Sequence, residues 1–399
     1  MLAMFAVSVG YSIVLPILPF LIEQLAGTTD PATLSWHTGL LTGTYVLAIF
    51  LFAPFWGKLS DRQGRMPVVL LGLVGLAVTL GLFAFFESLP LLYLGRFLDG
   101  IFAAAIAPAA YALVGDHAPS KEWRAYRFTL LNVAATAGFF VGPLLGGLVL
   151  RAGRELPPGV GDEFFAAPFF AASALALIAA SMTWGFVSEA AQRRTTEGAT
   201  INKPDKRAIM LRLSTIAFVS TLAIGAFEVG LSLRGKLVLG MDSYQIGMMF
   251  AECSIVMFLV QALVFSPLIK PDITRWFLTP GLAVLAIGLV LVPLASDFIV
   301  TTVAVALVAA SAGILSPIVT YWVSLIAGGS EGADLGWITA AGSLGQVLGS
   351  VAGGLLFYIS ILPNATFNVA AIIVLTGVAA SFGLPQLLMR LQTFAGASS

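Results

Sequence analysis

The stretch Gly57-Lys58-Leu59-Ser60-Asp61-Arg62-Gln63-Gly64-Arg65-Met66-Pro67 lies between two apolar runs, residues 37–56 and 67–86. Each run has about the 20 residues that a helix needs to cross the hydrocarbon core of a bilayer. The stretch itself holds three basic side chains, one acidic side chain and two glycines. Glycine permits the tight turn that two closely packed helices require. The sequence therefore predicts two membrane-spanning helices joined by a short charged loop.

The same alternation of apolar runs and short polar connectors continues along the whole chain. Of its 399 residues, 59% are hydrophobic and 10% are charged, and the mean hydropathy is +0.98. A soluble domain carries about 25% charged residues, so this chain has too little polar surface to be solvated by water. We predict an all-α membrane protein with twelve transmembrane helices in two pseudo-symmetric six-helix bundles. The predicted spans are 2–25, 37–56, 67–86, 91–113, 128–150, 165–187, 210–233, 244–267, 276–295, 299–326, 336–359 and 366–389.

The longest connector, residues 188–209, is polar and basic and divides the chain nearly in half. We predict an N-terminal six-helix bundle over 1–187, a cytoplasmic linker over 188–209 and a C-terminal six-helix bundle over 210–399. The apolar run that begins at Met1 lacks a basic leader and a small-residue cleavage site, so no cleavable signal peptide is expected.

The distribution of lysine and arginine predicts the orientation, because cytoplasmic loops are enriched in both residues. Alternate loops hold 15 basic residues on one side of the membrane and 4 on the other, and Arg96 lies within a span. This bias predicts that both termini face the cytoplasm, in a cell (inner) membrane. The 4 outer residues are Arg151, Arg154, Arg234 and Lys236.

A glycine pattern occurs twice, at a constant offset. Glycines 138, 142, 146 and 147 in the fifth span match glycines 345, 349, 353 and 354 in the eleventh, each pair 207 residues apart. Glycine at four-residue spacing also occurs wherever helices pack closely, but the shared offset favours duplicated halves. Parallel repeats of this kind suit a transporter whose site lies between two halves.

Three motifs resemble those of the major facilitator superfamily. The 57–67 stretch is similar to its Gly-x-Leu-x-Asp-Arg-x-Gly-Arg loop signature, and it lacks only the last basic residue, where Met66 stands. Arg96-Phe-Leu-Asp99-Gly100 resembles its buried-arginine motif. Gly138-(x)3-Gly142-Pro143-(x)2-Gly146-Gly147 resembles the antiporter motif of its drug:proton antiporters. With Pro16 and Pro19 in span one, the resemblance is closest to twelve-span tetracycline and multidrug efflux carriers.

The resemblance implies roles for several groups of residues. The loop residues would form a latch that closes the inner face, and the glycine face of span five would seal the domain interface. Spans one, four, seven and ten would line the substrate cavity. The implied latch residues are Gly57, Asp61, Arg62, Gly64 and Arg65; the antiporter residues are Gly138, Gly142, Pro143, Gly146 and Gly147; and the cavity candidates are Tyr11, Ser12, Tyr111, Glu228, Ser232, Tyr321 and Trp322.

Ionisable side chains inside membrane spans are costly and are candidates for function. Arg96 and Asp99 lie three residues apart in span four and can pair across a turn. Glu228 and Glu252 are carboxylates in spans seven and eight. All four residues are candidates for proton coupling. The alternatives are a permanent Arg96–Asp99 pair, a Glu228 near the interface beside Arg234, and a Glu252 that only bonds a neighbouring helix. Unlike many related antiporters, span one has no acidic residue up to Phe20.

The composition excludes several other classes of protein. The net charge is zero, which disfavours nucleic acid as a partner. One cysteine, Cys253, and two histidines, His37 and His117, make neither a disulfide framework nor a metal site. We expect no cofactor and no enzymatic activity, since no nucleotide loop or catalytic triad is evident. Aromatic side chains with few charges favour bulky amphipathic substrates.

The leading hypothesis is therefore a proton-driven exporter of drugs or other small amphipathic molecules, with protons and lipid as its other partners. The resemblance implies that the protein is a monomer. The alternatives are a dedicated exporter of a metabolite such as a siderophore or sugar, or a nutrient importer of the same fold. A channel is disfavoured by the duplicated halves.

Overall fold

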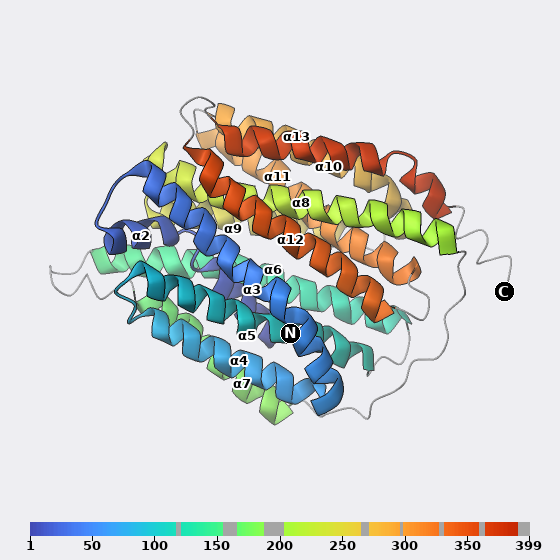
Figure 1. Ribbon diagram of the computed structural model, residues 1–399, viewed down its shortest axis with the longest axis horizontal. Coiled ribbons are helices and arrows are strands. Elements are labelled where there is room, and N and C mark those ends of the chain that lie inside the picture. Colours follow the sequence, from blue (N-terminus) through green and yellow to red (C-terminus); the bar gives the residue numbers. More distant parts are fainter. Residues whose placement is uncertain are drawn as a thin grey trace. The chain divides into compact units, whose positions relative to one another are not determined.

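The computed structural model describes residues 1–116, 121–154, 166–186, 203–264, 271–295, 298–326, 331–358 and 364–389. Within these ranges every regular element is a helix (Figure 1). The elements are α1 Leu2–Ser12, α2 Leu18–Ala26, α3 Pro31–Gln63, α4 Arg65–Phe83, α5 Leu89–Asp116, α6 Lys121–Arg154, α7 Ala167–Phe186, α8 Lys203–Leu237, α9 Ser243–Val264, a 3₁₀ helix Pro271–Phe277, α10 Leu278–Leu294, α11 Phe298–Ile326, α12 Glu331–Phe357 and α13 Ala365–Ser381.

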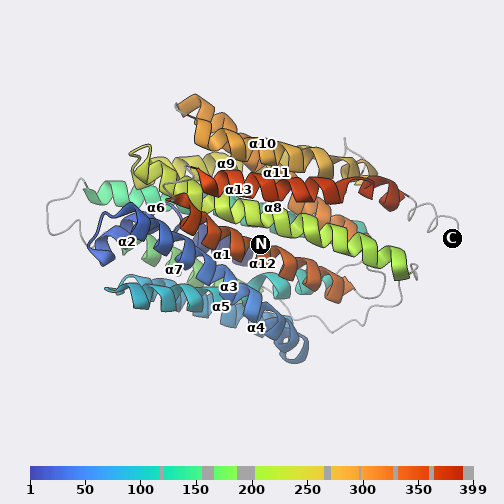
Figure 2. The same ribbon diagram turned by 45° about the horizontal axis from the view of Figure 1, so that its top comes forward.

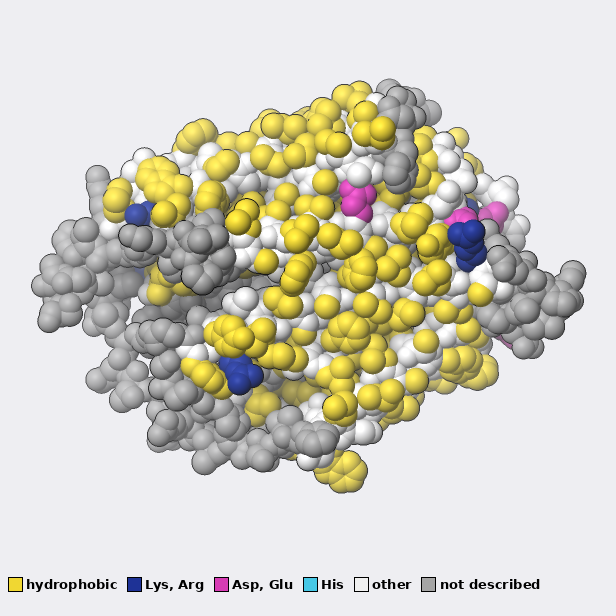
Figure 3. Space-filling model, turned by 180° about the vertical axis from the view of Figure 1, so that it is seen from behind, with side chains coloured by type: hydrophobic (Ala, Val, Ile, Leu, Met, Phe, Trp, Pro, Cys, Tyr) yellow, Lys and Arg dark blue, Asp and Glu magenta, His cyan; other side chains and the backbone are white. Residues whose placement is uncertain are grey.

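The prediction of an all-α membrane protein is confirmed. In the described part of the chain, 11 helices are long and apolar enough to cross a membrane. Large apolar side chains such as Trp184 and Ile299 are exposed, and hydrophobic side chains cover most of the described surface seen in Figure 3. A surface of this kind requires lipid as its solvent.

The first predicted span, 2–25, is two helices rather than one. α1 ends at Ser12, α2 begins at Leu18, and turns connect them. The break falls at Pro16, which has no N–H to continue the helical hydrogen bonds. The Leu15 amide N–H instead donates to the carbonyl oxygen of Ser12, three residues back, with the nitrogen 3.3 Å from the oxygen. α1 alone is only 11 residues long, so it is shorter than a membrane-spanning helix.

The expectation of a loop over 57–67 is largely wrong. α3 begins behind Asp30, whose carboxylate accepts a hydrogen bond from the Thr33 amide at 2.9 Å, and it continues as far as Gln63. The chain turns only at Gly64, which has a φ of 99°. Glycine adopts this backbone conformation without the strain that a side chain would add. The charged residues before Gly64 therefore extend α3 instead of forming a loop.

The chain divides into two compact units. Within the described residues, the first unit takes in 1–186 and 228–254, and the second takes in 203–227 and 255–389. In the first unit α4 packs on α5 and α7, α3 packs on α5, and α1 packs on α6 (Figure 2). In the second unit α10 packs on α11 and α13. The predicted linker lies outside the described residues as far as position 202, and α8 begins at Lys203.

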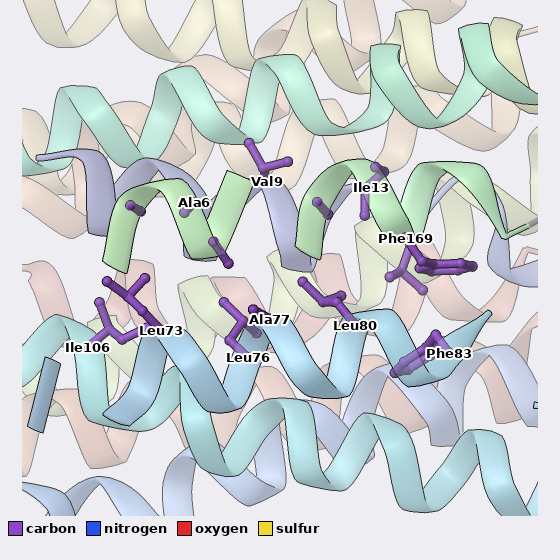
Figure 4. Close-up of a cluster of buried hydrophobic side chains, with 14 of the residues drawn as sticks. Ala6, Val9, Ile13, Leu73, Leu76, Ala77, Leu80, Phe83, Ile106 and Phe169 are labelled. Carbon is purple, nitrogen blue, oxygen red and sulfur yellow. The ribbon is translucent and has the colours of Figure 1, made fainter. Parts of the chain in front are cut away.

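The core of the first unit lies between α1, α4, α5 and α7. Figure 4 shows Leu73, Leu76, Leu80 and Phe83 in a row along α4, in one cluster with Ala6 and Val9 of α1. Phe169 of α7 closes one end of this cluster. In lipid, apolar side chains gain little by leaving the solvent, so close packing and dispersion hold such helices together. This packing fixes α1, which carries one of the polar groups described next.

Candidate transport site

Arg96 and Asp99 are buried together on α5. Their side chains are 0% and 1% exposed, and Arg96 Nη1 lies 4.0 Å from Asp99 Oδ2, at the limit of an ion pair. The Thr79 hydroxyl of α4 donates to Asp99 Oδ1. The pairing expected across one helical turn is therefore present but long, and a hydroxyl from a second helix also holds the carboxylate.

Aromatic rings hold the Arg96 guanidinium. Its carbon lies 4.5 Å from the ring centroid of Tyr45 and 5.8 Å from that of Tyr11. The two rings are stacked, with centroids 5.0 Å apart. Among the described residues, no acceptor lies within hydrogen-bond distance of the three guanidinium nitrogens. Cation–π attraction to these rings therefore adds to the Asp99 charge in stabilising the buried guanidinium.

Glu228 of α8 is buried, and the Tyr11 hydroxyl donates to its Oε2 at 2.6 Å. Tyr11 thus contacts two charged groups, because its ring faces Arg96 and its hydroxyl binds Glu228. One side chain therefore links the Glu228 carboxylate to the Arg96 guanidinium. With the Arg96–Asp99 pair, this arrangement joins three of the four predicted coupling residues, and Tyr11, a predicted cavity residue, connects them to Glu228.

The other predicted residues occupy varied positions. Glu252 is half-buried in α9. Ser12 is fully buried and donates to the Ser8 carbonyl at 2.6 Å. The Tyr111 hydroxyl donates to Asn132 Oδ1 at 2.9 Å.

Two predicted cavity residues belong to the second unit. Trp322 is buried, and its indole N–H donates to Thr274 Oγ1 at 3.1 Å. Tyr321 packs edge-on against it, with ring centroids 5.6 Å apart.

The glycine face of α6 packs directly on α1. A Cβ added at Gly138 would lie 2.3 Å from the Phe5 carbonyl oxygen, and one at Gly142 would lie 2.2 Å from Ser12 Oγ and 2.9 Å from the Val9 carbonyl oxygen. A Cβ at Gly146 would likewise lie 2.9 Å from the carbonyl oxygen of Ile13, the residue that follows α1. The near-contact with a neighbouring helix that the glycine spacing predicted is therefore present, and it involves the backbone of α1.

The same contact recurs in the second unit, between α12 and α8. A Cβ at Gly345 would lie 2.2 Å from the Phe218 carbonyl oxygen, and one at Gly349 would lie 2.0 Å from that of Leu222. Gly345 and Gly349 are the repeat partners of Gly138 and Gly142. The sequence repeat therefore corresponds to a repeated packing contact of glycine on a neighbouring backbone.

The predicted latch residues surround the end of α3. Asp61 pairs with Arg65 across the Gly64 turn, and Arg65 also donates to Ser60 Oγ at 2.8 Å. Arg62 is exposed. The expectation that Gly57 takes part in a tight turn is wrong, since Gly57 lies inside α3 and a Cβ there would meet nothing within 4 Å.

The sequence did not identify Tyr45 and Thr79, which contact Arg96 and Asp99. Thr79 is the one polar side chain in the apolar run 67–86, and this could have identified it as a candidate. Tyr45 lies in a span with other hydroxyl residues, and no local pattern distinguishes it.

Lys236, which the sequence assigned to an outer loop, pairs with Glu23.

Ionisable side chains buried inside an all-α membrane fold commonly mark substrate or ion pathways, and they are typical of polytopic transporters. The chain belongs to the Major Facilitator Superfamily, whose family model matches residues 1–329. The family recognised from the three motifs is thereby confirmed. Family and fold are those of transporters rather than enzymes.

Relatives and solved structures agree with this assignment. Multidrug resistance protein 2 of Bacillus subtilis (strain 168) is 27% identical over 369 residues, covering 90% of this chain and 87% of the relative. Tetracycline resistance protein, class B, of Escherichia coli is 36% identical over 171 residues, covering 43% of this chain and 39% of the relative. The crystal structure of the human organic anion transporter MFSD10 (TETRAN) superimposes with a TM-score of 0.73 at 20% identity, covering 95% of this chain and 97% of the other.

Proposed function

We propose that the chain is a proton-coupled antiporter that exports drugs or other small amphipathic molecules by alternating access. The observation that carries this proposal is the buried Glu228 carboxylate, which is bound by the Tyr11 hydroxyl, while the Tyr11 ring faces the Arg96 cation. The names of the relatives support export, since they describe multidrug, quinolone and tetracycline resistance proteins. Dedicated export of a metabolite and import of a nutrient are the alternatives that the experiments below separate.

The proposed mechanism uses the cost of burying charge. An ionised carboxylate away from water costs several kcal/mol unless it is paired and hydrogen-bonded. Protonation of Glu228 removes that charge and alters its contacts with Tyr11, which favours a different packing of the surrounding helices. Asp99, which shares Arg96 with this system, and Glu252 are the rival proton carriers.

The proposed architecture has twelve spans in two six-helix bundles, 1–187 and 210–399, with a cytoplasmic linker over 188–209. α1 and α2 together would provide the first span, and the repeated glycine contacts support duplicated bundles. The excess of basic residues in alternate loops supports an inner-membrane protein with both termini in the cytoplasm. We further propose a monomer.

The proposed substrate contacts are aromatic and hydroxyl side chains from spans one, four, seven and ten. Few charges and several rings suit amphipathic molecules. Ser12 and Trp322 are buried in the structure, so they would meet substrate only after the helices around them move. The proposed residues are Tyr11, Ser12, Tyr111, Ser232, Tyr321 and Trp322.

Counterflow in proteoliposomes tests the substrate class. Vesicles containing the purified protein are loaded with an unlabelled compound, and uptake of the same labelled compound is followed for a panel of drugs, sugars and siderophores. The proposal predicts exchange of amphipathic drugs. Exchange of sugars or siderophores alone would contradict it.

Asp61→Asn should abolish or severely slow transport while leaving the protein folded. The Asp61 side chain is 60% exposed, and a surface ion pair of this kind contributes about 0–1 kcal/mol to stability. We propose that its role is to latch the inner face, together with Gly57, Arg62, Gly64 and Arg65, so the substitution should affect the transport cycle and not the fold. Counterflow rates and thermal unfolding of the same preparation measure the two effects separately. Wild-type turnover in Asp61→Asn vesicles would contradict the latch.

A further inference from the structure

Three polar contacts join the first span to α8 at one constant offset. Each contact links residues that are 217 positions apart in the sequence. Successive contacts are four residues, or about one helical turn, apart on both sides. All of these residues belong to the first unit. The pairs are Tyr11 with Glu228 at 2.6 Å, Leu15 with Ser232 at 3.2 Å, and Pro19 with Lys236 at 2.9 Å.

These contacts form a ladder between two segments that run side by side in the same direction. Because the offset is constant, the two segments keep the same register at all three contacts. Lys236 extends the ladder by one more turn, because its ammonium group also pairs with Glu23. Its nitrogen lies 4.3 Å from the ring centroid of Phe20 as well. The register between the segments is therefore defined over about three turns.

The middle contact depends on a proline. In an α-helix the carbonyl of residue 15 would accept the amide N–H of residue 19. Residue 19 is proline, which has no N–H, and an unsatisfied carbonyl inside a membrane protein is costly. Ser232 of α8 supplies a donor, with Oγ 3.2 Å from the Leu15 oxygen. The same hydroxyl lies 3.0 Å from the Glu228 carbonyl oxygen, so its single hydrogen is shared between a bond within α8 and a bond to the first span.

The middle contact lies one turn from the Tyr11–Glu228 contact. A shift of one residue along a helix moves a side chain by about 1.5 Å and turns it by about 100°, which would separate the Tyr11 hydroxyl from the carboxylate. We propose that Pro19 and Ser232 are positioning residues: Pro19 leaves the Leu15 carbonyl open to the Ser232 hydroxyl, and this hydrogen bond fixes the register that holds Glu228 against Tyr11. The register itself is carried by the Leu15–Ser232 hydrogen bond. Its importance for transport rests on the proposed function of Glu228.

Thiol labelling at position 236 measures how often the two segments separate beside Pro19. Cys253→Ala removes the native thiol, and Lys236→Cys places one reporter there; it removes the Lys236 contacts from every variant alike, so differences in labelling rate report on the middle contact. The purified protein in lipid nanodiscs is exposed to a water-soluble thiol reagent on both sides. Ser232→Ala should raise the labelling rate about fivefold, which is the size expected for one net hydrogen bond. Ser220→Ala is the matched control, because the Ser220 hydroxyl is also buried in α8 but bonds only to carbonyls of its own helix; it should leave the rate unchanged.

A double-mutant cycle tests the link between the proline and the serine. Pro19→Ala restores an N–H that competes for the Leu15 carbonyl, so it should also speed labelling. The Pro19→Ala/Ser232→Ala double variant should label no faster than Ser232→Ala alone. Effects that multiply in the double variant, or equal rates for Ser232→Ala and Ser220→Ala, would overturn the proposal.

A transport measurement separates a positioning role from a general loss of structure. In Ser232→Ala vesicles, proton-driven accumulation should fall severalfold further than substrate exchange, which can itself change because Ser232 is also one of the proposed substrate contacts. Equal loss of both would contradict a role in coupling. If the wild-type protein transported no drug, the proposed function would be wrong. The labelling experiment would still test whether Pro19 and Ser232 fix the register.

Discussion

We expect Glu228→Gln to abolish proton-driven accumulation of substrate while leaving substrate exchange intact. Glutamine keeps the size of the side chain and mimics the neutral, protonated carboxyl group. With one proton exchanged per substrate, a difference of one pH unit supports about tenfold accumulation, since it corresponds to about 1.36 kcal/mol. The variant should show no accumulation above equilibrium, because it cannot release or take up the coupling proton.

Matched substitutions at the other carboxylates identify the proton carrier. Asp99→Asn and Glu252→Gln are measured in the same vesicles, with the same labelled compound and pH difference. If Glu228 carries the proton, Glu252→Gln should retain accumulation. Full accumulation by Glu228→Gln with an unchanged pH dependence would remove Glu228 from the mechanism. The Arg96–Asp99 pair would then become the favoured coupling element.

Gly142→Leu should both destabilise the protein and block transport. A Cβ added at this position would lie 2.9 Å from the Val9 carbonyl oxygen and 3.0 Å from the Ile13 amide nitrogen. The backbone of the first span would therefore have to move. Overpacking of this kind costs about 3 kcal/mol, which lowers the unfolding temperature of a chain of this length by roughly 4 °C. Displacement of α1 also moves Tyr11 away from Glu228. Thermal unfolding in detergent and counterflow measure the two effects.

Gly185→Leu is the control for this substitution. Gly185 lies in α7, and a Cβ there would meet nothing within 4 Å. The same increase in side-chain volume should therefore leave unfolding and transport close to wild type. Normal transport and stability in Gly142→Leu would show that the glycine face of α6 is not a tight interface.

The membrane fold could be predicted from the sequence because it depends on local length and hydropathy. Spans such as 67–86 match helices of the structure closely. The break in the first span was missed because proline is tolerated inside membrane helices, and the composition of 2–25 does not show whether Pro16 bends the helix or ends it. The helical continuation of α3 to Gln63 was missed because charged residues outside the bilayer can be helical or irregular.

The residues of the candidate site were predicted singly, but their contacts were not. Arg96, Asp99 and Glu228 could be identified because ionisable residues are rare within apolar spans. The stacking of Tyr11 on Tyr45 joins residues from two helices, and no local pattern encodes it. The pairing of Leu15 with Ser232 likewise depends on the register between the first span and α8, which appears only when the two segments lie together.

Substrate-driven proton movement tests the central claim of proton-coupled export most directly. Proteoliposomes are loaded with a compound that passes the counterflow screen and with a trapped pH indicator, and they are diluted into substrate-free buffer with the membrane potential clamped. Antiport predicts that the lumen acidifies as substrate leaves, and that Glu228→Gln vesicles show no acidification. Substrate efflux without a pH change, or with alkalinisation of the lumen, would contradict the account, because the first indicates uncoupled transport and the second indicates symport.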